Sequence, residues 1–352
     1  MAVSVNFTDA ELSGMALAQI GNPLRQEGLR TSKNLCKISD EDAELLTLCF
    51  LKPFKSLELH KLEHPDGLDS NPLHRSVSRI FENPEANLIE GSADIARHLY
   101  SNSNHPNIKS GDLCVAHLTN MMVDGEKTDA LSIIKSESKV PFLQITATGE
   151  DLQLTTQHGI YPDKIDKGCL IVNHGKADGY KVYLFDKSGN AQFWRCEFVN
   201  ASPVQDNDYL TRRYSEMCVA FANSDTDDES MREERFDVAK KAVSYLTEAE
   251  TFDMDDFSEV ALVEPKVSED FKAFKSAYEE EKVGKPLEES FVVSKKEAKK
   301  AERKINGRMQ LDVGVDLKFS TGFQKSAEQF MEKGFDQEKQ MKFVKIYYHA
   351  EG

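Results

Sequence analysis

The sequence predicts an α+β protein whose helices and strands are segregated into blocks. Helical periodicity dominates residues 39–102, strand alternation with glycine turns dominates 111–198, and helical periodicity returns from 206 onward. Elements that come in blocks, rather than alternating one by one, are typical of α+β folds and not of doubly wound parallel sheets. We expect N-terminal helices with a central antiparallel meander sheet, then a helical segment and a small C-terminal α/β unit.

The N-terminal block begins with short apolar patterns over residues 1–30. Ser39 or Asp40 is a candidate N-cap for the first helix, which Pro53 ends. Two further helices have apolar residues at helical spacing, and they are expected at 72–81 and 84–99.

The strand block opens with a hairpin. Asp124-Gly125 separates the apolar runs 112–124 and 128–136, and this dipeptide favours a turn that needs positive φ. Later apolar runs bounded by glycine turns predict further strands at 142–148, 152–156, 169–173, 180–185 and 192–198.

The C-terminal block is mostly helical. Helices are expected at 233–248, 269–281, 295–305 and 324–333, and short strands at 290–294, 309–315, 317–319 and 343–349. Ser268 is the candidate N-cap of the second of these helices. The stretch Asn200-Ala-Ser-Pro203 predicts a boundary between an N-terminal α+β domain, residues 1–203, and a helical and helix/strand domain, residues 204–352.

A basic segment at 294–308 is the sharpest local feature. It holds seven basic residues and two acids, a net charge of +5 in fifteen residues. Ser294 followed by Glu297 forms a capping-box pattern, which predicts that a helix starts here. Its basic residues recur every four positions in two adjacent stripes, which can contact phosphates along a groove, although a solvated helix face without a ligand is the alternative. The candidate DNA-binding residues are Lys295, Lys296, Lys299, Lys300, Arg303, Lys304 and Arg308.

The rest of the chain is strongly acidic. The 352 residues carry a formal net charge of −16, which excludes binding through an all-over basic surface. Residues 225–259 alone hold thirteen acids and four bases. This acidic region is either a solvated surface or a docking surface for a protein partner.

The sequence gives weaker support for two other kinds of site, a nuclease centre and a histidine metal site. Asp124, Asp129 and Glu137 with Lys139 could hold Mg²⁺ in a nuclease. However, charged residues are also expected at strand ends. His60 and His64 have a helical metal-ligand spacing but no third ligand, so exposed loop histidines are expected, with no metal and no cofactor.

Three features of the sequence predict that the protein is located in the cytosol. The N-terminus has no basic and apolar leader, and no stretch approaches the about 18 apolar residues of a membrane helix. The six cysteines form no close-spaced pairs, which predicts buried free thiols in a reducing cytosol.

Several segments together resemble the NdpA-type bacterial nucleoid-associated proteins, in a Bacteroidetes-like branch. They span almost the whole chain, from about residue 10 to 349, and are specific as a set rather than singly. The segments that carry the resemblance are 50–55, 95–100, 105–113, 123–126, 134–137, 166–172, 192–194 and 248–253.

This resemblance implies a cytosolic, non-enzymatic protein on the bacterial nucleoid that binds DNA. It supplies no motif for the DNA contact, so the candidate residues come from the charge pattern of 294–308. We expect duplex binding without strong sequence specificity, and a homodimer, because two copies of the basic helix would double the phosphate contacts. The alternatives are an adaptor recruited through the acidic region 225–259, and a Mg-dependent nuclease.

Overall fold

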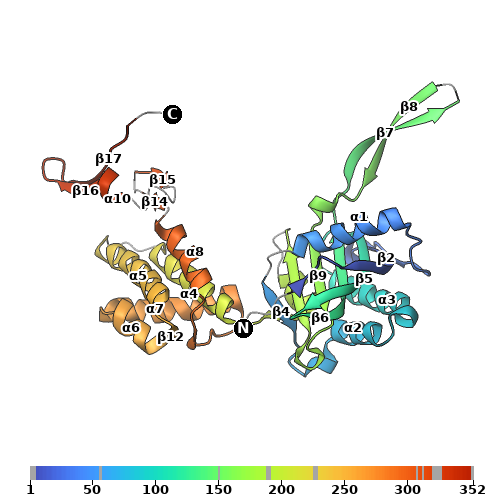
Figure 1. The fold of residues 1–352 in the computed structure, drawn as a ribbon, viewed down its shortest axis with the longest axis horizontal. Helices are drawn as coiled ribbons and strands as arrows, with labels where there is room; N and C mark the ends of the chain where they lie inside the picture. Colours follow the sequence, from blue (N-terminus) through green and yellow to red (C-terminus); the bar gives the residue numbers. More distant parts are fainter. Residues whose placement is uncertain are drawn as a thin grey trace. The chain divides into compact units, whose positions relative to one another are not determined.

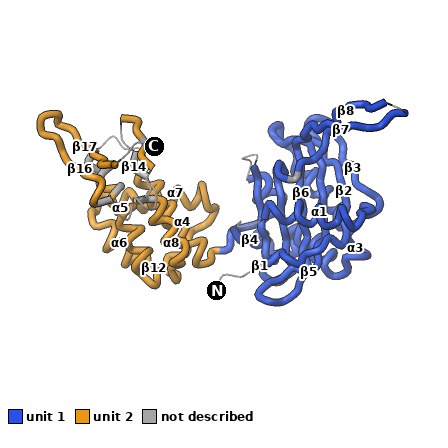
Figure 2. Tube along the Cα trace, turned by 45° about the horizontal axis from the view of Figure 1, so that its top comes forward, with its two compact units in different colours: residues 1–204 blue, residues 205–352 orange. Residues whose placement is uncertain are grey.

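The computed structural model describes residues 5–54, 58–149, 151–187, 192–224, 229–306, 308–310, 313–318 and 327–349. The chain forms two compact units, Met1–Val204 and Gln205–Gly352 (Figure 2). Each unit has its own buried apolar core. The predicted α+β class is confirmed, because helices and an antiparallel sheet occupy separate layers of the first unit.

Nine of the described strands of the first unit form one antiparallel sheet. Eight of them follow one another in the order β11-β4-β10-β9-β6-β5-β2-β3, and β1 adds to β5. The strands are β1 (Val5–Asn6), β2 (Glu11–Ile20), β3 (Leu29–Thr31), β4 (Leu59–Leu62), β5 (Gly111–Val123), β6 (Glu126–Ser136), β9 (Lys167–Val172), β10 (Lys181–Asp186) and β11 (Ala201–Pro203).

Helices cover both faces of this sheet. α1 (Asp40–Leu51) lies on one side, and α2 (Pro72–Glu82) and α3 (Pro84–Asn102) lie on the other (Figure 1). Successive residues of β5 alternate between the two cores, as Leu113 and Cys114 do. Short 3₁₀ turns connect the elements at Pro23–Arg25, Lys52–Phe54, Leu68–Ser70, Pro162–Lys164 and Lys176–Asp178.

The sheet departs from a simple meander in two places. β4 comes from the loop before α2 and pairs with both β10 and β11. β7 (Val140–Thr148) and β8 (Asp151–Gly159), expected within the meander, pair with each other as a separate two-stranded sheet that projects from the first unit (Figure 1). The prediction that these two strands join the central sheet is therefore wrong.

A short π-helix, η6 (Gln192–Val199), replaces the strand expected at 192–198. Phe193, Trp194 and Phe198 are buried on it, and the Trp194 ring packs against Phe198 at 4.7 Å between centroids. The indole nitrogen of Trp194 donates to the carbonyl oxygen of Gly168 at 3.0 Å. A short apolar run has no clear period, so the pattern did not separate strand from helix.

The second unit is built on helices around an aromatic core. Its elements are α4 (Asn207–Ala222), α5 (Glu229–Glu248), β12 (Thr251–Asp253), α6 (Met254–Ala261), α7 (Pro265–Tyr278), η7 (Glu279–Val283), β13 (Ser290–Val292) and α8 (Lys295–Asn306). Phe252 of β12 lies opposite Phe291 of β13, and their rings stack at 4.8 Å between centroids. α7 starts at Pro265 and not after Ser268, because proline suits the first turn of a helix.

The C-terminal part adds small strand pairs. They are β14 (Arg308–Gln310) with β15 (Asp316–Lys318), and β16 (Met331–Asp336) with β17 (Met341–Ile346). The helix expected at 324–333 is wrong beyond Phe330, because α10 (Ala327–Phe330) gives way to β16. Residues 324–326 lie outside the described residues.

No helix within the described ranges is long and apolar enough to cross a membrane. All six cysteines are free thiols, but not all of them are buried as expected. Cys114, Cys169 and Cys218 are buried, and burial raises the pKa of the Cys114 thiol to about 12. Cys196, by contrast, is exposed.

Candidate nucleic-acid interface

The basic helix forms where the sequence predicts it, but its cap is only half of a capping box. The Ser294 hydroxyl accepts from the backbone N–H of Glu297 at 3.4 Å. The backbone N–H of Ser294 donates to the Thr211 hydroxyl at 2.9 Å. The Glu297 carboxylate is buried and accepts from Lys300 at 2.7 Å. α8 is thus held to α4 at the capping residue that precedes it.

The buried side of α8 fixes which residues face solvent. Glu297 and Ala298 are buried, and α8 packs against α4 and α5 through this side. A helix turns by about 100° per residue, so the opposite side is centred near Arg303. The basic residues within about 60° of that direction share the spacing i, i+3, i+4, i+7. They form the basic face of α8: Lys296, Lys299, Lys300 and Arg303.

Lys295, in contrast, supports the fold. Its ammonium group donates to the backbone carbonyl oxygens of Thr247, Glu248 and Ala249 at 2.9, 3.2 and 2.6 Å. These carbonyls lie at the C-terminal end of α5, where a cation is favoured by the helix dipole. Lys295 is therefore engaged in capping α5 and is half-buried.

The remaining candidate DNA-binding residues differ in their exposure and in whether a carboxylate lies beside them. Lys296 is 70% exposed and lies 3.8 Å from an Asp208 oxygen, and Lys300 is 59% exposed beside Glu297. Lys299, Arg303 and Lys304 are exposed. Three candidates have no ion pair to a carboxylate of the described part of the chain: Lys299, Arg303 and Lys304. The side chain of Arg308 lies outside what the structure describes, although its backbone belongs to β14.

The residues of the nuclease hypothesis are not brought together. Asp129 lies in the first half of β6 and Glu137 just beyond its last residue, eight residues and about 26 Å apart along an extended chain. Asp129 lies 3.4 Å from the His117 ring, and Lys139 pairs with Asp112 at 3.1 Å. Asp124 occupies the tight turn before β6, with φ of 51°. These four side chains share no magnesium site.

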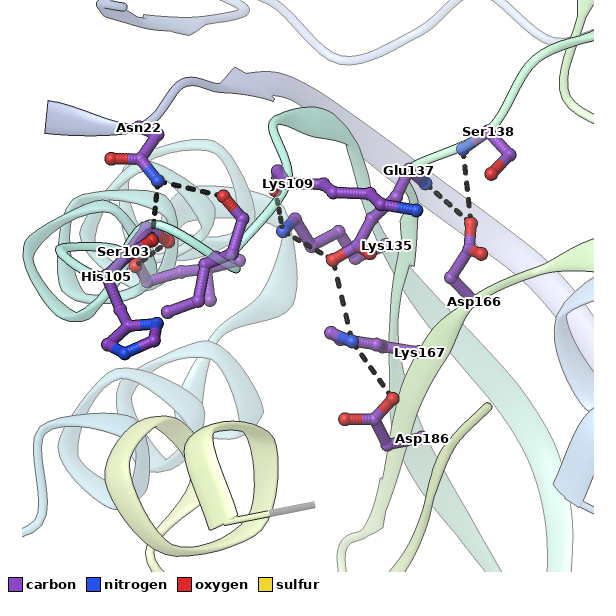
Figure 3. A network of polar contacts seen from close by, with 12 residues as sticks. Asn22, Ser103, His105, Lys109, Lys135, Glu137, Ser138, Asp166, Lys167 and Asp186 are labelled. Atoms are coloured by element: carbon purple, nitrogen blue, oxygen red, sulfur yellow. Dashed lines mark hydrogen bonds and ion pairs between the residues drawn. The ribbon is translucent and has the colours of Figure 1, made fainter. Parts of the chain in front are cut away.

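Glu137 instead belongs to a set of buried charges that we call the charge ladder: Lys135, Glu137, Lys167 and Asp186 (Figure 3). The Glu137 carboxylate lies 2.9 Å from the Lys135 ammonium and 3.5 Å from that of Lys167, which lies 2.9 Å from Asp186. All four side chains are at most 3% exposed.

Cross-strand register explains the charge ladder. Lys135 of β6 faces Lys167 of β9, which faces Asp186 of β10. Two lysines directly opposite each other repel, and Glu137 compensates them both. Burial lowers the pKa of Lys135, and the nearby Glu137 opposes this shift. Lys135, Lys167 and Asp186 stand at or next to the ends of their strands, where charged residues are expected to be exposed, so sequence reasoning did not find this set.

His60 and His64, which have the spacing of metal ligands on a helix, do not lie on a helix. His60 lies in β4, is buried, and its Nδ1 contacts the Glu58 carbonyl at 3.1 Å. The expectation of an exposed loop histidine is wrong for His60, because β4 joins the sheet. Among the residues that the structure describes, no group of three His, Cys, Asp or Glu side chains could hold a metal ion.

The acidic region lies on α5, β12 and α6, apart from residues 225–228, which lie outside the described residues. Asp253 caps α6 by accepting from the backbone N–H groups of Asp255 and Asp256. Several other acids here project into solvent: Glu248, Glu250, Asp255, Asp256 and Glu259.

The fold and the charge pattern define a two-unit α+β protein whose candidate ligand-binding surface is one basic helix. A family model described as NA37, nucleoid-associated protein YejK, matches residues 19–342. The chain belongs to this family of nucleoid-associated proteins, and the predicted resemblance is confirmed at the level of the family. No curated protein matches the chain.

Proposed function

We propose that this protein binds duplex DNA on the bacterial nucleoid, without strong sequence preference and without catalysing a reaction. The basic face of α8 makes the contact in the cytoplasm. One observation carries the proposal: four cations share the solvent-facing side of a single helix in a chain of net charge −16. Lysine and arginine contacts with phosphates give affinity and orientation but do not read sequence. Membership of a nucleoid-associated family supports the choice of DNA as the ligand.

The size of the basic face sets how many phosphates it can contact. Lys296 and Arg303 are seven residues apart, about 10 Å along the helix axis. One DNA strand carries a phosphate about every 3.4 Å along the duplex axis. The face therefore spans about three phosphates, so one copy binds weakly and salt opposes binding strongly.

Charge reversal on the full-length chain tests the proposal. The variant Lys299→Glu, Lys300→Glu, Arg303→Glu should weaken duplex affinity by about 100-fold or more, because hydrogen bonds to charged groups contribute about 1.5–3 kcal/mol each. The matched control reverses three exposed lysines on α5 and α7 by the same total charge: Lys240→Glu, Lys241→Glu, Lys272→Glu. The control should bind nearly as the natural chain does. Equal losses in both variants, measured by fluorescence anisotropy, would refute the basic face of α8 as the site.

The same reasoning favours a homodimer. Two copies of the basic face would contact about six phosphates instead of three, and the salt-dependent affinity grows with each contact. The mass of the protein in solution, free and bound to DNA, tests this part.

A second candidate function is that of an adaptor recruited to the nucleoid by a protein partner. The exposed acids of α5 and α6, including Asp255 and Asp256, favour it because they would attract a basic protein and repel DNA. A pure sample that fails to bind duplex DNA at low salt would support the adaptor over the DNA-binding proposal.

A further inference from the structure

The hairpin of β7 and β8 is an arm without a partner in the described structure. Its strands pair from Val140 opposite Gly159 to Thr148 opposite Asp151, and neither strand joins the central sheet. The arm projects away from the body of the first unit (Figure 1). An isolated two-stranded hairpin is marginally stable in water, so an arm of this length is expected to gain from a partner.

The two faces of the arm differ sharply. Ile145 lies opposite Leu154, and Ala147 lies opposite Leu152, so these side chains share one face with Leu143. The large residues of this apolar face are widely exposed: Leu143 by 69%, Ile145 by 67%, Leu152 by 78% and Leu154 by 61%. The other face carries Phe142 near its base, 52% exposed, and is otherwise mostly polar, with Gln144, Thr146, Gln153, Thr155 and Gln157. This alternation is the pattern of a sheet surface that has one covered side.

Charge selects the kind of partner. Residues 140–160 contain only Glu150, Asp151 and His158 as ionisable residues, although charged residues make up 30% of the chain. Two copies of this acidic chain repel each other over most of their surfaces, but not here. Asp151 lies on the polar face and only His158 on the apolar face, so neither DNA nor a strongly basic protein would find a complementary charge cluster on the apolar face. The surface therefore fits a second copy better than a charged ligand.

The area of the face sets the strength of the contact. Nine residues span about 30 Å and two strands span about 10 Å, so each copy offers roughly 300 Å². Two copies bury roughly 600 Å² in total, below the about 1,000 Å² of a stable interface. The contact is thus weak and depends on concentration. An identical arm matches the face in size and shape, as an isologous twofold interface requires.

We propose that the apolar face of β7 and β8 is a contact surface for a second copy of this chain. The two arms pack face to face about a twofold axis, with Ile145 and Leu154 near the axis. This inference names the surface of the homodimer proposed above and rests on that dimer, but it does not depend on the DNA contact of α8.

Sedimentation velocity of the full-length chain over a range of concentrations tests the surface. The natural chain should shift from the 39.7 kDa monomer toward twice that mass as concentration rises. Ile145→Lys with Leu154→Lys should stay at the monomer mass over the same range. The matched control, Thr146→Lys with Gln153→Lys, places the same charges on the polar face of the same strands and should behave as the natural chain does.

A charge-swap experiment tests the identity of the partner. Mixing the lysine variant with Ile145→Glu, Leu154→Glu should restore a dimer that neither variant forms alone. A natural chain that remains monomeric throughout would overturn the dimer and the surface together. A dimer unaffected by the lysine variant, or one lost equally in the polar-face control, would overturn the surface alone. Unchanged Trp194 fluorescence would show that each variant is folded, since this residue is buried in the same unit.

Discussion

Replacing Glu137 by glutamine should expose how the charge ladder is balanced. Glu137 is the carboxylate that contacts both Lys135 and Lys167, and these two lysines face each other across adjacent strands. In Glu137→Gln, Asp186 still compensates Lys167, but the buried charge of Lys135 loses the carboxylate that contacts it and keeps only the more distant Asp166. Loss of one partner from a buried ion pair destabilises a protein by about 3–5 kcal/mol.

Proton loss from Lys135 limits that destabilisation. An ordinary lysine has a pKa of about 10.4, so deprotonating it costs about 4 kcal/mol at pH 7.5 and about 1 kcal/mol at pH 9.5. In the variant the unfolded chain holds more protons than the folded chain below pH 10.4, so stability rises with pH there. We therefore expect a loss of about 3–4 kcal/mol at pH 7.5 that shrinks toward 1–2 kcal/mol at pH 9.5.

Urea denaturation followed by tryptophan fluorescence measures this loss in the correct unit. The chain has one tryptophan, Trp194, which is fully buried in the first unit. Asp112→Asn is the control, because its ion pair with the 54% exposed Lys139 should contribute at most about 1 kcal/mol. Adding Lys135→Met to Glu137→Gln should recover most of the stability, since no lone charge remains. A loss in Glu137→Gln that is as small as the control's and independent of pH would refute this reasoning.

Three further predictions concern single side chains. Burial lowers the pKa of His98, whose Nε2 donates to the Phe198 carbonyl at 2.9 Å. Below about pH 6.5 the unfolded chain therefore binds more protons at this position than the folded chain. The free energy of unfolding of the first unit should fall by up to about 1.4 kcal/mol for each pH unit. Urea denaturation at pH 7 and 5.5 should show a smaller difference in His98→Gln. Gly179→Ala should cost about 3 kcal/mol or more in the same assay, because a Cβ would lie 2.0 Å from a carbonyl oxygen of β4. Gly175→Ala also places alanine in the αL region but in open space, and should cost only about 1–2 kcal/mol. Lys295→Met should destabilise the second unit by about 1–2 kcal/mol in thermal denaturation followed by circular dichroism, yet leave DNA affinity nearly unchanged.

The sequence predicted best the turns and helix starts that are set by residues within a few positions of them. Asp124 and Gly125 have positive φ, as the hairpin turn between β5 and β6 requires. The first residue of α8 follows from its cap, and the helix ends one residue beyond the predicted 305. The order of the strands could not be predicted, because β4 is only four residues long and finds its partners far along the chain.

The errors have physical causes. β7 and β8 carry the alternation of sheet strands, and that alternation is the same whether the apolar side is covered by the chain itself or exposed on an arm. The spacing of lysines in α8 predicted two stripes but not that the C-terminal end of α5 lies beside the first residue of one stripe. As a result Lys295, which caps α5, could not be told from Lys299, which faces solvent.

The salt dependence of duplex binding tests the central claim most directly. For each copy of the natural chain bound, the logarithm of the association constant should fall with the logarithm of salt concentration with a slope of about −3. Lys299→Ala with Arg303→Ala should flatten this slope by about 2 units, roughly one for each phosphate contact removed. Lys295→Met, which changes a lysine of the same helix, should leave the slope unchanged. A slope that is the same in the natural chain and in the Lys299, Arg303 variant would contradict DNA binding through the basic face of α8.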